Sequence, residues 1–190
     1  VQKANEQSLR EHEKELQASE MWLRSLFDVS PVAVLILDLG GRVTDCNRRF
    51  PEMIDRRRVE IVGRSYFDFI HPDETQAARE GVGRLLENPS LQVFSAERAY
   101  LRRDGCLVHG LLSARRLPAA GGGEDVLMVI ISDITELRRA EAMHRESEIK
   151  LQAVFNASPV AMIVSDMGRD FAVVAANEAW ERQFLHVRDE

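Results

Sequence analysis

The sequence predicts an α+β protein, and three observations lead to this prediction. Two stretches, roughly residues 2–29 and 135–156, have helix-forming composition and contain neither proline nor glycine. Between them lie five segments of strand length, bounded by turn residues. The beginning of the chain also recurs near its end. The predicted order is therefore helix, two strands, short helices, helix, three strands, helix.

Composition excludes several classes of protein. The 190 residues are 45% hydrophobic and 29% charged, which allows a buried core and argues against wholesale disorder. The longest apolar runs, 32–37 and 126–131, fall short of the roughly 20 residues of a membrane helix. A net charge of −6 disfavours nucleic acid as the main partner. Two cysteines form no disulfide framework and the polar beginning shows no secretory leader, so we expect a cytoplasmic protein.

The repeat places residues 19–38 over residues 147–166. Both copies contain Ser-Glu, a leucine, a phenylalanine, the run Ser-Pro-Val-Ala and a closing aspartate. After a two-residue insertion in the second copy, Asn47-x-x-Phe50 lies over Asn177-x-x-Trp180. A period of this length is that of a whole domain, so it indicates tandem duplication. The second copy stops early and the first residue is Val1, so we expect a piece of a longer polypeptide.

Each predicted helix carries a heptad pattern in the same register relative to its copy. We expect both helices to mediate homodimerisation as a weak coiled coil, because five of the twelve seam positions carry polar or small residues, namely His12, Ser19, Ala140, His144 and Ser147. The alternative is a single amphipathic helix that packs on its own domain. The seam residues of the predicted dimer helices are Leu9, Leu16, Leu23, Leu26, Leu137, His144 and Leu151.

Helix-breaking prolines and turn residues set the boundaries of the predicted helices and strands. Pro31 and Pro159 end the helices that precede them, because the residue before proline is disfavoured in the α conformation. Asp104-Gly105 supplies hairpin geometry between the two long strands. We predict a helix from His71-Pro72 to about Glu87, and strands at about 32–37, 42–46, 91–101, 107–117 and 126–133.

Short motifs mark these boundaries: Ser30-Pro31, Asp38-x-x-Gly41, Asn47-x-x-Phe50, Val62-Gly63-Arg64-Ser65, Phe69-Ile70-His71-Pro72-Asp73, Arg102-Arg103-Asp104-Gly105 and Asp133-Ile134-Thr135-Glu136. Their order and spacing resemble the PAS domain, a sensory module of signalling proteins. The resemblance covers about residues 20–138 and restarts at about Glu148. One departure is Asp55, where many relatives have a turn glycine.

The resemblance implies a five-stranded antiparallel sheet in the order 2-1-5-4-3, with small helices that enclose a pocket over one face. It also implies that Asp133, Ile134 and Thr135 couple the last strand to the exit helix; the alternative is a helix cap with no role in coupling. The implied organisation is a signal helix, a PAS domain, a linker helix and the start of a second PAS domain, at residues 1–29, 30–135, 136–157 and 158–190.

Several residues are candidates to line the implied pocket, and each is equally well explained as core. They are Asn47, Phe50, Met53, Tyr66, Phe67, Leu85, Phe94 and Leu111. Tyr66 stands where flavin-adduct relatives carry cysteine, so we reject that photochemistry. Residues 74–87 contain no histidine of the kind that haem-binding relatives supply, and we do not expect haem.

Non-covalent FAD stays open, although the body of the first domain lacks the tryptophan that such relatives often use. We expect either no cofactor or a small organic ligand. The sequence contains no phosphate-binding loop, no metal-ligand spacing and no catalytic set. The run Arg56-Arg57-Arg58 fits either a contact with an acidic partner or a solvated loop.

The leading hypothesis is a non-enzymatic sensory and relay segment of a multidomain protein. The parent would be a histidine kinase, a diguanylate cyclase or a phosphodiesterase. The alternatives are a haem- or FAD-binding redox or gas sensor and a ligand-free dimerisation scaffold. We also expect the strand at 160–165 to dock on another chain or stay loosely ordered, because the central strand that would cover it is missing.

Overall fold

The computed structural model describes residues 2–88, 91–118, 123–169 and 171–184, with side chains from residue 12 onward except that of Arg169. The chain divides into two compact units, Val1–Glu136 and Leu137–Glu190. Each unit is described by itself.

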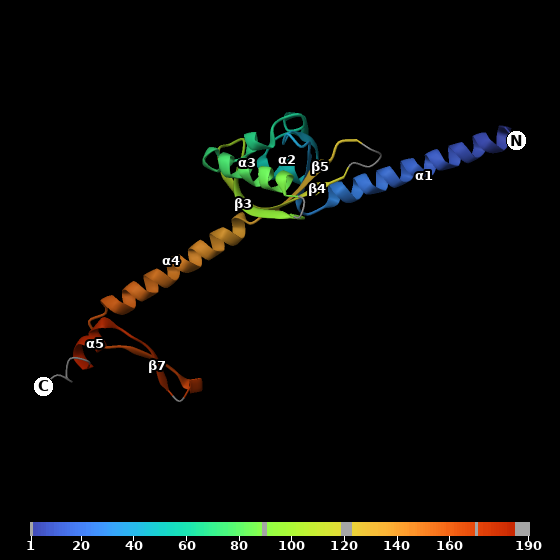
Figure 1. The fold of residues 1–190 in the computed structure, drawn as a ribbon. Helices are drawn as coiled ribbons and strands as arrows, with labels where there is room; N and C mark the ends of the chain where they lie inside the picture. Colours follow the sequence, from blue (N-terminus) through green and yellow to red (C-terminus); the bar gives the residue numbers. More distant parts are fainter. Residues whose placement is uncertain (1, 89–90, 119–122, 170, 185–190) are drawn as a thin grey trace. The chain divides into compact units, whose positions relative to one another are not determined.

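The first unit begins with the long helix α1 (Gln2–Val29) and contains one antiparallel sheet (Figure 1). The sheet order is β2-β1-β5-β4-β3, which confirms the strand order that the resemblance implied. Its strands are β1 (Ala33–Leu37), β2 (Val43–Cys46), β3 (Phe94–Leu101), β4 (Leu107–Leu117) and β5 (Val126–Asp133). The two most apolar strands, β1 and β5, are neighbours near the middle of the sheet.

One face of the sheet is covered by helices, and the core lies between the two layers (Figure 1). The covering elements are α2 (Arg49–Ile54), η1 (Arg58–Glu60), η2 (Tyr66–Phe69) and α3 (Pro72–Glu87). Side chains of β5 alternate in burial, so Leu127, Val129 and Ile131 face the core and their neighbours face outward. Helix α3 starts as predicted, with His71 as the N-cap and Pro72 at the first helical position.

The start of one strand differs from the sequence-based expectation, and one turn residue has an unusual conformation. β3 begins at Phe94 rather than Leu91, because the Leu91 amide donates to the Asn88 carbonyl and so belongs to the turn after α3. Asp55, which departs from the family pattern, has φ 53° and ψ 52° at the end of α2. This left-handed conformation suits glycine, which explains why relatives have glycine there.

The second unit contains most of α4 (Thr135–Ala157), followed by β6 (Ile163–Asp166), η3 (Met167–Arg169), β7 (Ala172–Ala176) and α5 (Glu178–Phe184). β6 and β7 pair as a two-stranded antiparallel sheet. The pair Ile163 and Ala176 reproduces the pair Leu35 and Cys46 of the first unit, and the same register shift follows. The duplication seen in the sequence is therefore also a duplication of register.

The apolar side chains of this hairpin are exposed, including Val164, Val173 and Val174. The predicted strand is thus paired on one side only among the described residues. Its docking on another chain stays a prediction. None of the described helices is both long and apolar enough to cross a bilayer.

Candidate functional site: the joints between helices and sheet

The end of α1 is tied to the sheet by one buried side chain, that of Asn47. Its Oδ1 accepts from the Val34 amide at 2.9 Å, and its Nδ2 donates to the carbonyls of Phe27 (3.1 Å) and Val32 (2.9 Å). The backbone N–H of Asn47 also donates to the Val34 carbonyl at 2.9 Å. Since the carbonyls in the last turn of a helix lack intrahelical partners, Asn47 satisfies one that would otherwise be unpaired. We call these four residues the first asparagine joint.

The second unit contains the same arrangement around Asn177. Its Oδ1 accepts from the Met162 amide at 2.9 Å, and its Nδ2 donates to the carbonyls of Phe155 (3.0 Å) and Val160 (2.8 Å). The backbone N–H of Asn177 donates to the Met162 carbonyl at 3.0 Å. These four residues form the second asparagine joint, and it ties the end of α4 to the β6–β7 hairpin.

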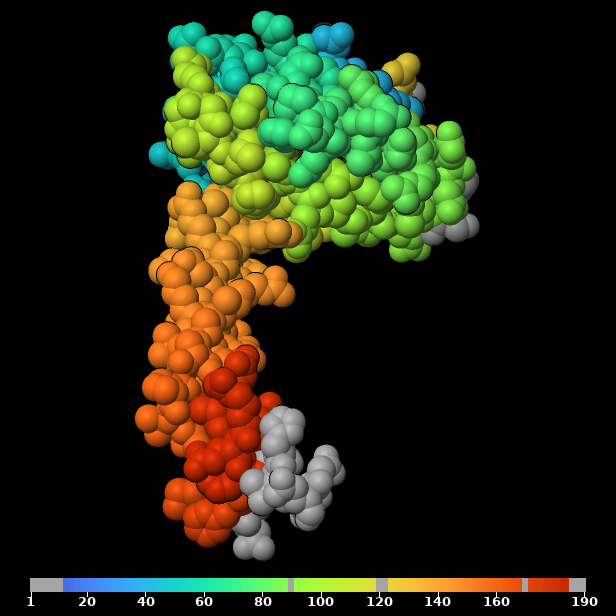
Figure 2. Space-filling view, turned by 90° about the vertical axis from the view of Figure 1, so that its left-hand side faces the viewer, coloured from blue at the N-terminus to red at the C-terminus, as the bar shows by residue number. Residues whose placement is uncertain are grey.

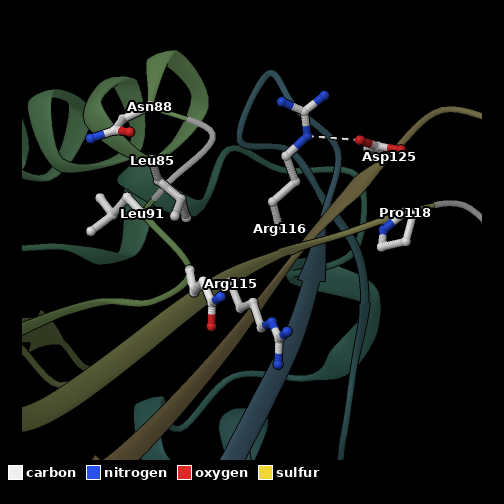
Figure 3. A pocket seen from close by; sticks show the side chains of 8 residues that line it. Leu85, Asn88, Leu91, Arg115, Arg116, Pro118 and Asp125 are labelled. Carbon is white, nitrogen blue, oxygen red and sulfur yellow. Dashed lines mark hydrogen bonds and ion pairs between the residues drawn. The ribbon is translucent and has the colours of Figure 1, made fainter.

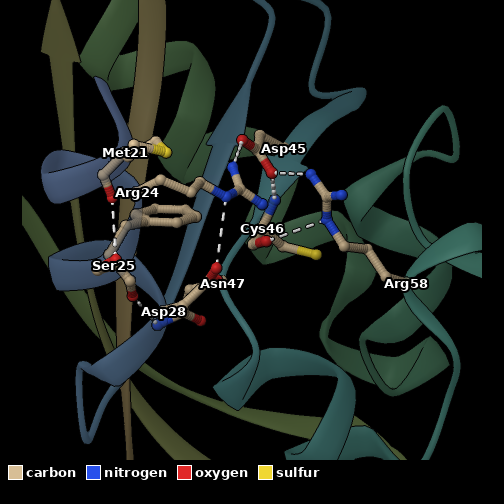
Figure 4. Close-up of polar contacts among 9 residues, drawn as sticks. Met21, Arg24, Ser25, Asp28, Asp45, Cys46, Asn47 and Arg58 are labelled. Carbon is tan, nitrogen blue, oxygen red and sulfur yellow. Dashed lines mark hydrogen bonds and ion pairs between the residues drawn. The ribbon is translucent and has the colours of Figure 1, made fainter. Parts of the chain in front are cut away.

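Among the described residues, a set of charges reinforces only the first of these joints. Arg24 of α1 and Arg58 of η1 both donate to the carboxylate of Asp45 on β2 (Figure 4). Arg58 Nε also donates to the Cys46 carbonyl at 3.3 Å. We call Arg24, Asp45 and Arg58 the charge clamp. Partial burial alone would raise the pKa of Asp45, but the hydrogen bonds from the two arginines outweigh it and lower that pKa below its ordinary value.

The start of α4 is bound to the neighbouring strand β4 at a single residue, His109. The Ile134 amide donates to the His109 carbonyl at 2.8 Å, and the His109 amide donates to Thr135 Oγ1 at 3.0 Å. Asp133 Oδ1 accepts from the Thr135 amide at 2.9 Å and caps the helix. We call His109, Asp133, Ile134 and Thr135 the exit joint. Asp133 thus caps the helix, as one of the two hypotheses predicted. Ile134 and Thr135 also connect the helix to β4 through their hydrogen bonds with His109.

The predicted pocket residues mostly lie in the core of the first unit. Phe50, Met53, Tyr66, Phe67 and Leu85 are buried there, and Asn47 is engaged in its joint. The ring of Phe94 packs against Gly81, where an added Cβ would lie 2.6 Å from it.

Leu111 is misplaced in that prediction. It is 45% exposed on the face of the sheet that points away from the helices, whereas its neighbour Leu112 is buried. Consecutive side chains of a strand point to opposite faces, and the prediction assigned Leu111 to the wrong one.

The centre of the core contains a pair of tyrosines, of which sequence reasoning identified only Tyr66. The hydroxyls of Tyr66 and Tyr100 are 2.7 Å apart, and the Phe50 ring meets Tyr100 edge-on. Burial raises the pKa of Tyr66 to about 12 and raises that of Tyr100 well above its ordinary value. Both hydroxyls therefore stay protonated at neutral pH and neither serves as a base.

A surface pocket of about 320 Å³ lies between the end of α3 and the ends of β4 and β5 (Figure 3). Leu85 is the one predicted pocket residue that lines it. Arg116 and Asp125 form an ion pair at 2.7 Å on one side. The remaining lining residues are Asn88, Leu91, Gln92, Arg115 and Pro118.

The described side chains include no cluster of three potential metal ligands. Cys46 is buried and Cys106 is exposed, and both are free thiols.

The seam residues of both helices are at the surface of their own units. α1 turns Arg24 and Phe27 toward its domain, whereas Leu23 is 57% exposed. On α4, Leu151 is 69% exposed and His144 also lies at the surface. None of the described residues of α4 is buried, and Figure 2 shows this helix, in orange, with its side chains at the surface. The side chain of Leu9 lies outside the described residues; Leu16, Leu26 and Leu137 are exposed. The described seam leucines are therefore not buried against their own units, while the end of α1 does contact its own domain through Arg24 and Phe27.

Comparison with solved structures identifies the fold. The PAS domain of an HTR-like protein from Haloarcula marismortui is 26% identical, with a TM-score of 0.56, and the match covers 66% of this chain and 99% of that one. The PAS domain of a protein from Colwellia psychrerythraea is 19% identical, with a TM-score of 0.55, and the match covers 61% of this chain and 97% of that one.

Two curated proteins match at the level of sequence. A probable diguanylate cyclase, DgcE of Escherichia coli K12, is 21% identical over 139 residues, which are 73% of this chain and 12% of DgcE. The sensor histidine kinase TmoS of Ectopseudomonas mendocina is 20% identical over 166 residues, which are 85% of this chain and 17% of TmoS. The chain thus spans less than a fifth of either relative.

Family models agree with the duplication. A model described as "PAS domain" matches residues 149–185, within the second unit. A model described as "PAS fold" matches residues 27–139, which is more than half of the chain. The chain belongs to the PAS family of sensory domains, with one whole domain followed by the start of a second.

Proposed function

We propose that this chain is a signal-relay segment that dimerises through α1 and α4 and passes an event in its PAS domain to α4. The exit joint is the observation that carries the proposal. β4 is held by β5 on one side and β3 on the other, and its residue His109 brackets the first turn of α4.

The mechanism follows from the two hydrogen bonds that connect His109 of β4 to Ile134 and Thr135 at the start of α4. A displacement of β4 must either move the start of α4 with it or break the bonds from Ile134 and to Thr135. Each intramolecular hydrogen bond contributes about 0.5–1.5 kcal/mol net. Moving the helix is therefore favoured over breaking the bracket for small displacements of the strand.

The helix surfaces supply the second part of the proposal. Leu16, Leu23, Leu137 and Leu151 are exposed at heptad spacing, and this apolar surface is covered if two copies pair. The polar residues among them, including His144, weaken the pairing. A weak seam allows two packings of similar free energy, so that a modest signal can favour one of them.

The activity of the parent protein is also a proposal. The two curated relatives are named as a diguanylate cyclase and a sensor histidine kinase. We propose that this segment is not itself an enzyme and that it regulates an output domain of one of those kinds, or a phosphodiesterase, within the same polypeptide.

Sedimentation velocity tests the dimerisation. Leu23→Lys with Leu151→Lys places two charges in the seam and should shift the chain toward monomer. The matched control is Gln17→Lys with Ala153→Lys. It adds the same two charges outside the seam, one residue after Leu16 and two residues after Leu151, and should leave the association unchanged. Replacement of His12 and His144 by valine should tighten it. A wild-type chain that stays monomeric at high concentration, with the valine variant also monomeric, would contradict the seam mechanism.

A further inference from the structure

We propose that an arginine-lined pocket on the first unit binds a small phosphate-class oxyanion. The pocket has a volume of about 410 Å³ and is lined by Pro51, Glu52, Asp55, Arg56, Arg57 and Arg103. We call it the arginine pocket. It joins the end of α2 to the turn between β3 and β4, two segments about fifty residues apart in the sequence.

Glu60 shows which chemistry these arginines are arranged to hold. Its Oε2 accepts from the Arg57 amide at 2.8 Å, from Arg57 Nε at 3.4 Å and from Arg103 Nη2. These donors lower the pKa of Glu60, with the Arg57 amide as the largest cause. One carboxylate oxygen thus receives three N–H groups, which is a typical anion-binding arrangement.

The arginines are oriented before any ligand arrives. Arg103 Nε donates to the Asp55 carbonyl at 3.2 Å, and the Arg103 amide donates to the Ile54 carbonyl at 3.2 Å. The left-handed conformation of Asp55 turns the chain so that Arg56 and Arg57 follow α2 directly. Fixed guanidinium groups lose little conformational entropy on binding an anion.

Arg56 has one buried donor atom that no described residue satisfies. Its guanidinium lies over the Phe69 ring, with 5.9 Å between Cζ and the ring centroid. Its Nε is buried and has no hydrogen-bond partner among the described residues. An unpaired buried donor is unfavourable, and an oxyanion at the pocket would satisfy donors of this guanidinium.

The local charge favours a dianion over a monoanion. The pocket and the residues paired with it carry three acidic groups and five arginines, a surplus of +2 on a chain of net charge −6. The acidic groups are Glu52, Asp55 and Glu60, and the arginines are Arg48, Arg49, Arg56, Arg57 and Arg103. Guanidinium groups match phosphate geometry by paired hydrogen bonds.

NMR titration with inorganic phosphate at constant ionic strength tests the proposal, with chloride and acetate as parallel titrants. We expect saturable shifts at the amides of residues 55–60 and 103 with phosphate and only weak, unsaturable shifts with chloride. Acetate should bind at least about tenfold more weakly than phosphate, because it carries one charge. Equal responses to the three anions would overturn the proposal.

Three variants localise the binding. Arg57→Gln with Arg103→Gln should weaken phosphate binding by about tenfold or more, whereas Arg64→Gln, which removes an exposed arginine outside the pocket, should not. Glu60→Gln should bind phosphate several-fold more tightly, because it removes the carboxylate that competes for Arg57 and Arg103. Unchanged affinity in Glu60→Gln, or an equal loss in Arg64→Gln, would show that the arginine pocket is not the site.

Discussion

The two asparagine joints share four hydrogen bonds but differ in charge. In the second, Asn177 Oδ1 also accepts from the Trp180 amide at 3.0 Å. Asn47 and Asn177 each tie a helix end to the first strand of a unit through the same set of atoms. The charge clamp is present only at the first. At the positions of Arg24 and Asp45, the second unit has Gln152 and Ala175, and Val164 faces Ala175 as Ile36 faces Asp45.

The asparagines and the charge clamp therefore have different roles. The asparagine is required for the fold, whereas the clamp only holds α1 more firmly. The asparagine satisfies buried backbone groups that would otherwise be unpaired, so both copies have it. The clamp lies at the surface, so the fold can form without it. We infer that α1 is held to its sheet more firmly than α4 is held to the β6–β7 hairpin.

The largest expected effect is that of Asn47→Ala. It removes three side-chain hydrogen bonds and leaves the groups of Phe27, Val32 and Val34 unpaired, which should destabilise the first unit by about 3–5 kcal/mol. Urea unfolding followed by the NMR intensities of β5 amides measures it.

Asn177→Ala is the matched variant for the second joint. It should abolish the exchange protection of the β6 and β7 amides and leave that of β5 unchanged. If Asn47→Ala costs less than about 1 kcal/mol, the joint is not what holds α1 to the sheet.

Thr135→Val tests whether one side chain holds the exit joint together, as one asparagine does in each asparagine joint. It leaves the His109 amide without its acceptor and should destabilise the first unit by about 1–2 kcal/mol. Amide exchange at His109 and in the first turn of α4 should accelerate. Thr135→Ser retains the hydroxyl and serves as the control; an equal effect in both variants would mean that the loss does not come specifically from the hydrogen bond to Thr135 Oγ1.

Asp45→Asn tests the charge clamp. The partners are partly exposed, so solvent screening limits the expected loss of stability to about 1 kcal/mol or less, and added salt should reduce it further. Because the folded-state pKa of Asp45 is lowered, its contribution is present above the ordinary pKa of 3.8 and is lost as pH falls through the folded value.

The stabilities of wild type and Asp45→Asn should therefore differ at pH 7 and converge in acid. Chemical unfolding at a series of pH values provides the measurement. A difference that persists unchanged below pH about 2 would assign the effect to packing rather than charge.

The smallest effect is expected when part of the clamp is moved to the second joint. Gln152→Arg with Ala175→Asp should pair across the register shared by the two units and add about 0.3–0.5 kcal/mol. Exchange protection of β6 and β7 should rise modestly in low salt. The two single substitutions are the controls, and a gain in either one alone equal to that of the pair would exclude the ion pair as its cause.

Much of the fold was predictable because its signals are local. The breaker Pro31, the hairpin residues Asp104-Gly105 and the apolar strand at 126–133 each act within a few residues of themselves. The start of β3 was placed three residues too early, since a turn hydrogen bond at Leu91 overrides the apolar character of that segment.

The candidate site was less predictable, because it depends on pairs of residues far apart in the sequence. Asp133 and Thr135 were identified through their motif, but their bond to His109 needs β4 beside β5. Nothing near Arg24 in the sequence indicates that Asp45 and Arg58 will meet it, and nothing near Tyr66 indicates that Tyr100 will contact it. Leu111 was assigned to the pocket because composition does not tell which face of a strand a residue occupies.

The amino-acid sequence by itself determined the duplicated unit, the heptad spacing of both helices and the asparagine at each joint. These follow from short-range preferences of the backbone and from repetition, which need no knowledge of distant contacts. The tertiary structure decided which hydrogen bonds and charges meet: the bracket at His109, the clamp on Asp45 and the arginine pocket. Such contacts form between segments that only the folded sheet brings together, and their strength depends on burial that the chain acquires on folding.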